Sequence, residues 1–122
     1  MEKYVVRAVA SGLKFDLKAP NGQVVATSET YESKAACLKG LASVRKNGPK
    51  AKLEDQTEDP VITAVNPKFE LYRDKAGEYR FRLKAKNGQI IAISESYRAK
   101  AACLDGIESV RLYAADAEVE GI

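Results

Sequence analysis

Apolar and polar residues alternate along two stretches of the second half of the chain. Residues 79–85 alternate over seven positions, and residues 69–72 alternate over four. A period of two is typical of a strand that buries one face. Asp74–Gly77 lies between the two stretches and Asn87-Gly88 follows them, and both carry the residues that tight turns need. Residues 89–94 are then predicted to return as a third strand.

From residue 99 to about residue 113 the period changes to that of a helix. Apolar or small residues recur at i, i+3, i+4 and i+7, at Cys103, Gly106, Ile107 and Val110. The second half of the chain is therefore predicted to have the element order β-β-β-α. A glycine inside a helix costs about 1 kcal/mol of helix propensity. Gly106 on the apolar side is best explained by a close approach of another element, and Gly40 holds the same place in the first half.

The same pattern occurs earlier in the chain at an offset of about 66 residues. FDLKAPNGQ from Phe15 recurs as FRLKAKNGQ from Phe81, and SETY from Ser28 recurs as SESY from Ser94. KAACL from Lys34 recurs from Lys100, and Gly40 through Arg45 return as Gly106 through Arg111 with several identities. Most aligned positions are identical, so the chain carries a tandem duplication.

The duplication organises the whole chain as a single α+β domain. It divides into repeat one at 1–48, a charged, proline-punctuated linker at 49–67, repeat two at 68–114 and an acidic tail at 115–122. One repeat of about 50 residues buries too little surface to be secure. Both repeats are therefore expected to share one antiparallel sheet, with two helices packed on one face. Whether residues 61–65 add a strand to it stays open.

Strand parity assigns the two faces of this sheet. If Asn87-Gly88 forms a two-residue turn, Leu83 lies opposite Ala92 and Ala85 lies opposite Ile90. The helix should cover the face that carries Phe81. The opposite, open face is then basic and partly apolar, and its residues form the candidate site for an anionic or protein partner: Tyr72, Arg80, Arg82, Lys84, Ile91 and Ile93.

Composition argues against most enzymatic chemistry. The 122 residues include no histidine, which excludes histidine general bases, histidine-activated nucleophiles and most zinc or haem ligation. We therefore predict a non-enzyme without a cofactor. The formal net charge is +3, but acidic residues concentrate in 54–59 and 116–120, so the two repeats are more basic than the whole.

Neither a membrane span nor a disulfide framework is expected. No apolar run approaches the roughly 20 residues of a membrane helix, and the first residues lack the apolar core of a signal peptide. Cys37 and Cys103 lack the close spacing of metal or redox sites. We read them as reduced thiols in the core of a cytoplasmic protein.

Two further groups of residues are candidates for chemistry. Ser33, Lys34 and Lys100 stand at the predicted helix starts, where free backbone N–H groups bind anions. The alternative is that Ser33 caps its helix while the lysines lie in solvent, and this alternative is favoured. Glu29 and Glu95 could pair for acid–base work, but carboxylates before a helix commonly serve to start it.

The second copy closely resembles the YegP-like repeat of small, uncharacterised bacterial proteins. The resemblance rests on FELY at residue 69, DKAGEYRFRLKA at 74, NG at 87, SESY at 94 and KAAC at 100, and it extends over both copies. It implies two β₃-α units joined into one sheet, with the C-terminal helices exchanged between the units. It implies no established activity. Asp16 departs from the pattern, because Arg82 holds that position in the second copy.

The sequence therefore favours a small, non-enzymatic binding module. Its basic open face would take an anionic partner, for which nucleic acid is a candidate. The alternative is a protein-interaction or self-association module that uses the same face. An enzyme is the least favoured class. We expect a monomer with internal pseudo-two-fold symmetry, since the two repeats already complete each other.

Overall fold

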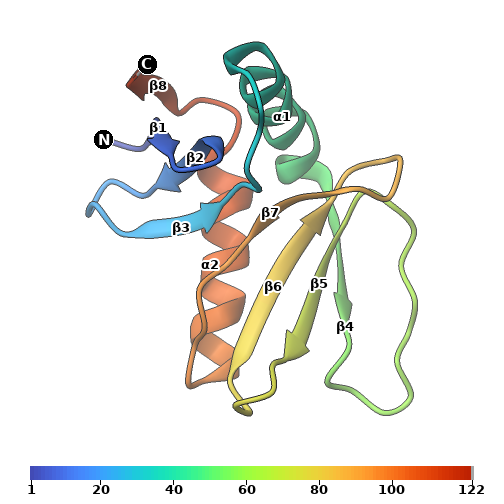
Figure 1. Ribbon diagram of the computed structural model, residues 1–122. Helices are drawn as coiled ribbons and strands as arrows, with labels where there is room; N and C mark the ends of the chain where they lie inside the picture. The colour runs from blue at the N-terminus through green and yellow to red at the C-terminus, as the bar shows by residue number, and fades with distance from the viewer. Residues whose placement is uncertain (122) are drawn as a thin grey trace.

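The computed structural model describes residues 1–121 as an α+β fold with one mixed sheet of eight strands and two helices (Figure 1). The strands lie in the order β4-β5-β6-β7-β3-β2-β1-β8. The elements along the chain are β1 (Lys3–Val9), β2 (Gly12–Lys18), β3 (Val24–Thr27), α1 (Lys34–Asn47), the short 3₁₀ helix η1 (Gly48–Lys50), β4 (Lys52–Asp55), β5 (Lys68–Arg73), β6 (Tyr79–Lys84), β7 (Ile90–Ile93), α2 (Lys100–Tyr113) and β8 (Glu118–Gly121).

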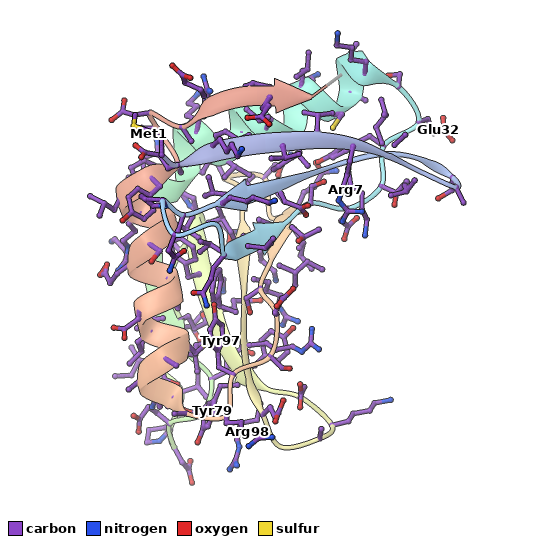
Figure 2. The ribbon with its side chains drawn as sticks, turned by 90° about the vertical axis from the view of Figure 1, so that its left-hand side faces the viewer. Met1, Arg7, Glu32, Tyr79, Tyr97 and Arg98 are labelled. Atoms are coloured by element: carbon purple, nitrogen blue, oxygen red, sulfur yellow. The ribbon has the colours of Figure 1, made fainter. Side chains whose placement is uncertain are left out.

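The prediction of a purely antiparallel sheet is wrong at both edges. β4 pairs parallel to β5, and β8 pairs parallel to β1, whereas the inner strands pair antiparallel. Each edge strand follows a helix that carries the chain back across the sheet, and this return makes parallel pairing possible. The two inner halves meet only at the pair Thr27–Ile93. Their strands run at a steep angle to each other (Figure 2).

The segments expected to be linker and tail contain these two edge strands. β4 lies inside residues 49–67, and β8 lies inside residues 115–121. Residues 61–65, which the sequence left open, form no strand, and four of these five are exposed. At the offset of 66 residues β4 and β8 are equivalent. Their sequences, KLED and EVEG, share only a glutamate and an apolar residue.

Both helices pack on the face of the sheet that carries the core phenylalanines. α1 lies on β2 and β7, and α2 lies on β6 and β3. Phe15 and Phe81 are buried beneath them. A Cβ atom at Gly106 would lie 2.6 Å from the Tyr97 hydroxyl and 3.0 Å from the Phe81 ring. This close approach is the one that the helical glycine predicts.

The turn at Asn87-Gly88 differs from the expected two-residue form. Ala85 N–H donates to the Gln89 carbonyl, so the loop holds three residues, and only Gly88 has a positive φ, of 87°. A register shift follows in the β6–β7 pair. Leu83 lies opposite Ala92 as predicted, but Ile90 lies opposite Lys84 instead of Ala85. The bulge absorbs one residue of β7.

Candidate anion-binding face

The sheet face turned away from the helices carries alternate residues of β1, β2, β5 and β6. Cross-strand pairs of the same parity define it, such as Tyr72 with Arg80 and Arg7 with Lys14. We call it the open face; its charged and aromatic members are Lys3, Arg7, Lys14, Asp16, Lys18, Lys68, Glu70, Tyr72, Arg80, Arg82 and Lys84.

The two apolar residues predicted for this face, Ile91 and Ile93, lie in different environments. Ile93 lies opposite Arg82 and is half-buried. Ile91 is buried and belongs to the hydrophobic core cluster, because the bulge beside Lys84 changes its environment. The open face therefore has less apolar surface than the sequence predicts.

Two buried carboxylates lie beneath the cations of β5 and β6. Glu70 accepts from Arg82 Nε at 2.5 Å, and the ammonium groups of Lys68 and Lys84 each lie 3.2 Å from its other oxygen. Lys68 also lies 2.8 Å from Glu54, which belongs to the edge strand β4. These five residues form a continuous ionic network, which we call the carboxylate network. Three cations in it face two anions.

Sequence reasoning missed both carboxylates. The sequence could have placed Glu70 on the open face, since Glu70 stands two residues before Tyr72 in the same strand and must share its face. No sequence pattern places Glu54 there. It lies in a segment with the composition of a linker, and only the parallel pairing of β4 with β5 brings it to the site. Its backbone partner in that pairing is Glu70 itself.

The network shifts the pKa of each carboxyl in it. The hydrogen bond from Lys68, with another from Gln56, lowers the pKa of Glu54 to about 2 against the opposing effect of burial. Burial favours the neutral form of Glu70, but hydrogen bonds from Arg82, Lys68 and Lys84 outweigh it and lower its pKa as well. The Glu54 hydrogen bond in turn raises the pKa of Lys68. Glu54, Glu70 and Lys68 are therefore charged at neutral pH.

These shifts predict an acid-sensitive contribution to stability. Because the folded-state pKa of Glu54 is about 2 and its ordinary value is 4.5, its contribution is complete above pH 4.5 and is lost as pH falls toward 2. Each such carboxyl adds a slope of at most about 1.4 kcal/mol per pH unit. Urea unfolding from pH 7 to pH 2 should show Glu54→Gln less stable than wild type at pH 7, with the difference shrinking below pH 4.5.

Glu120→Gln is the matched control for this measurement. Glu120 is the repeat equivalent of Glu54 and contacts Lys3 at 3.0 Å in an exposed pair. Its replacement should change stability little at any pH, because solvent screens such a pair. A pH-independent difference between wild type and Glu54→Gln would contradict the assignment.

The cations of the second half lie outside their carboxylates. The side chains of Arg82 and Lys84 are 30% and 26% exposed, whereas that of their partner Glu70 is 4% exposed. Arg80, whose side chain is 39% exposed, pairs at 2.9 Å with Asp74, whose side chain is 18% exposed. The Arg82 guanidinium lies 4.6 Å from the centre of the Tyr72 ring. A ligand that approaches from solvent therefore meets positive charge first, although the network beneath is nearly neutral.

The first half keeps this layering, but a carboxylate stands at the position that Arg82 holds in the second half. Asp16, at the position of Arg82, is buried and accepts from Arg7 Nε at 2.8 Å and from the Thr27 hydroxyl at 2.9 Å. Lys14 and Lys18 flank it on β2. Neither lysine forms an ion pair within residues 1–121. They are the free cations of the open face.

The two helix starts differ. The Ser33 hydroxyl caps α1 by accepting from Ala36 N–H at 3.1 Å, and Lys34 beside it is exposed. At the start of α2, Lys100 contacts Asp55 at 2.6 Å and Glu58 at 3.1 Å. An external anion at Lys100 would have to displace two carboxylates of the same chain.

The remaining candidates for chemistry do not come together. The antiparallel pairing of Thr27 with Ile93 carries the chain onward in opposite directions, so Glu29 lies near Ile91 and away from Glu95. Cys37 and Cys103 are buried free thiols. Burial raises the pKa of Cys103 to about 11 and also raises that of Cys37, which opposes nucleophilic chemistry.

Residues 1–121 contain neither a cluster of metal-binding side chains nor a membrane-spanning helix. No group of three or more histidine, cysteine, aspartate or glutamate side chains among them could hold a metal ion. Within the same residues, neither helix has the length and hydropathy needed to span a membrane.

Comparison with known proteins identifies the class. The model of a domain of unknown function, DUF1508, matches residues 10–55 and again residues 74–120. A UPF0339 protein of Mannheimia succiniciproducens is 43% identical over 108 residues, which cover 88% of this chain and 82% of the relative. A shorter UPF0339 protein of Treponema denticola is 62% identical over 52 residues, 43% of this chain and 90% of its own.

The fold agrees with a solved structure. The solution structure of YegP from Escherichia coli, described as a protein of unknown function, superimposes with a TM-score of 0.78 at 31% identity and covers 98% of this chain and 91% of its own. The protein is thus of the DUF1508 class. It belongs to the UPF0339, or YegP-like, family, as the sequence resemblance predicts. The family is uncharacterised, and none of these relatives has an enzyme name.

Proposed function

We propose that the protein is a non-enzymatic binding module whose open face takes an anionic partner, with single-stranded nucleic acid as the first candidate. The observation that supports this most is the layering of charge: buried carboxylates lie beneath cations that reach solvent, as Glu70 does beneath Arg82 and Lys84 and Asp16 beneath Arg7. Buried acids hold the guanidinium and ammonium groups in place, while a phosphate backbone would contact only the outer, positive layer.

Tyr72 and the free lysines extend this surface beyond the network. The Tyr72 ring beneath Arg82 offers an aromatic group on which a base could stack. Lys14 and Lys18 add unpaired positive charge on the neighbouring half of the sheet. We propose that the protein binds as a monomer in the cytoplasm.

The helix exchange implied by the family resemblance is part of the same proposal. Arg45, in α1, donates to the carbonyl of Ala117, which follows α2. Arg111, in α2, donates at 2.9 Å to the carbonyl of Ala51, which follows α1. These reciprocal contacts, with the pairing of β4 to β5 and of β8 to β1, support two units that complete each other.

Self-association through the open face is the weaker alternative. It would need apolar area at the centre of the face, but Ile91 is buried there and Ile93 is half-buried. A mass by light scattering that stays at one chain over a wide concentration range would exclude it. A mass that rises with concentration, and falls when Ile93 is replaced by serine, would favour it over anion binding.

The test of anion binding uses variants that leave the carboxylate network intact. Lys14→Gln/Lys18→Gln/Arg80→Gln removes three cations of the open face, none of which contacts Glu54 or Glu70. The matched control, Lys34→Gln/Lys39→Gln/Lys46→Gln, removes the same charge from exposed positions on α1. Binding of a fluorescent single-stranded oligonucleotide is measured by anisotropy between 20 and 300 mM salt.

We expect wild type and the α1 control to bind with a steep salt dependence. The open-face variant should lose most of its affinity at low salt, and its slope of log K against log salt should fall by about 2, because each lost contact to a single strand contributes about 0.7. Equal loss in the two variants would show that net charge alone attracts the oligonucleotide. No retention by wild type at low salt would overturn the proposal.

A further inference from the structure

A cleft of about 560 Å³ lies on the other side of the sheet, between the two copies of the repeat. Residues 19–25, the loop after β2 and the first two residues of β3 in the first copy, form one wall. The other wall is a stripe along α2 of the second copy, where Asp105, Ser109 and Tyr113 follow one another at a spacing of four residues. Small-molecule sites commonly occupy clefts of this size between structural units.

Tyr97 and Gly106 shape the inner end of the cleft. The Tyr97 hydroxyl lies so close to α2 that a Cβ atom at Gly106 would be 2.6 Å from it. Because Gly106 has no side chain, the Tyr97 ring reaches the helix and lines the cleft; Figure 2 shows this residue between α2 and the strands. Burial raises the pKa of Tyr97, so its phenol is neutral at pH 7 and offers both a ring and a hydroxyl.

Among residues 1–121, Asp105 is the only charged residue that lines the cleft. It is exposed, and its carboxylate makes no ion pair or hydrogen bond with any side chain in residues 1–121. Two tyrosines, Tyr97 from the segment before α2 and Tyr113 at its last residue, line the same cleft with their aromatic rings. A carboxylate beside aromatic rings suits an ammonium or guanidinium group, and Val24 and Val25 offer apolar contact for the body of such a ligand.

This chemistry belongs to one copy only. At the offset of 66 residues, Asp105 corresponds to Lys39 and Pro20 to Lys86, so the equivalent position near α1 is positive. Tyr113 corresponds to Asn47, which is buried and donates to the Ser43 carbonyl at 2.9 Å. The negative charge and the aromatic lining are therefore not consequences of the repeat pattern.

We propose that this cleft binds a small organic cation, an amine or guanidinium group carried on a short apolar body, with Asp105 as its counter-ion. The site is independent of the anion-binding face, since it has the opposite charge and lies on the helix side of the sheet. Tyr97 and Tyr113 contact the cation, and the wall at residues 19–25 covers its hydrocarbon part.

The test is a titration of the full chain, labelled with nitrogen-15, followed by amide chemical shifts. Butylguanidinium and butylamine are the probes, and butanol and butyrate are the neutral and anionic controls. We expect saturable shifts for the two cations at residues 19–25 and 102–113, and none for butyrate. Asp105→Asn should weaken binding about tenfold or more, and Tyr113→Leu should weaken it several-fold.

Asp59→Asn is the matched control, since it removes one exposed carboxylate far from the cleft in sequence and should leave the affinity unchanged. Equal binding of butanol would show an apolar pocket without charge selection and would overturn the proposal. Unchanged affinity in Asp105→Asn, or shifts that map to another surface, would overturn it as well. None of these outcomes depends on whether the open face binds an anion.

Discussion

Replacing Lys68 with alanine should lower the free energy of unfolding by about 3 kcal/mol, because it leaves the buried carboxylate of Glu54 without its cation. This is the lower end of the usual range for breaking a buried ion pair, since Glu70 keeps Arg82 and Lys84 as partners. Urea unfolding at pH 7, followed by circular dichroism, measures the change.

The repeat supplies the control for this prediction. Lys3 is the structural equivalent of Lys68, because it lies opposite Lys18 as Lys68 lies opposite Lys84. It contacts Glu120 at 3.0 Å, but the two side chains are 38% and 61% exposed. Lys3→Ala should therefore cost less than about 1 kcal/mol. Equal losses in the two variants would mean that burial does not distinguish the pairs, and the account of the carboxylate network would be wrong.

The second large effect is expected from Gly106→Leu, which should also destabilise the fold by about 3 kcal/mol. Its first side-chain atom alone would lie 2.6 Å from the Tyr97 hydroxyl and 3.0 Å from the Phe81 ring. Phe81 is fully buried, so it cannot move aside without disturbing the core. The better helix propensity of leucine recovers only about 1 kcal/mol of this cost.

Ala101→Leu tests whether the position on the helix decides the outcome. Ala101 is exposed on α2, so leucine there should change the melting temperature little. Thermal unfolding of both variants is the measurement. A melting temperature of Gly106→Leu equal to that of wild type would contradict the placement of α2 against Tyr97 and Phe81.

The inner strands and both helices could be predicted because each buries one face. The alternation around Phe81 and the helical spacing around Cys103 are direct consequences of that burial. The edge strands β4 and β8 gave no such signal. They pair along one side only, all four residues of β8 are exposed, and only one of the four residues of β4 is buried, so neither strand shows a period-two pattern of burial.

The candidate site was predictable to the same degree. Parity placed Tyr72, Arg80 and Arg82 on one face, and the structure brings them together there. Strand parity could not predict that Glu54 lies at the site, because its position depends on a parallel pairing between segments that no local pattern connects. Nor could strand parity predict the bulge at Ile91, because the choice between a two-residue and a three-residue turn depends on the backbone angle φ at Gly88.

We propose that the layered charge of the open face binds an anionic partner. The most direct test is to map a short single-stranded oligonucleotide on the nitrogen-15-labelled chain at low salt, with side-chain signals of Arg7, Arg80 and Arg82 included. We expect shifts confined to β1, β2, β5 and β6 that disappear as salt is raised. Shifts confined to the helices, or the absence of any shift at low salt, would contradict it.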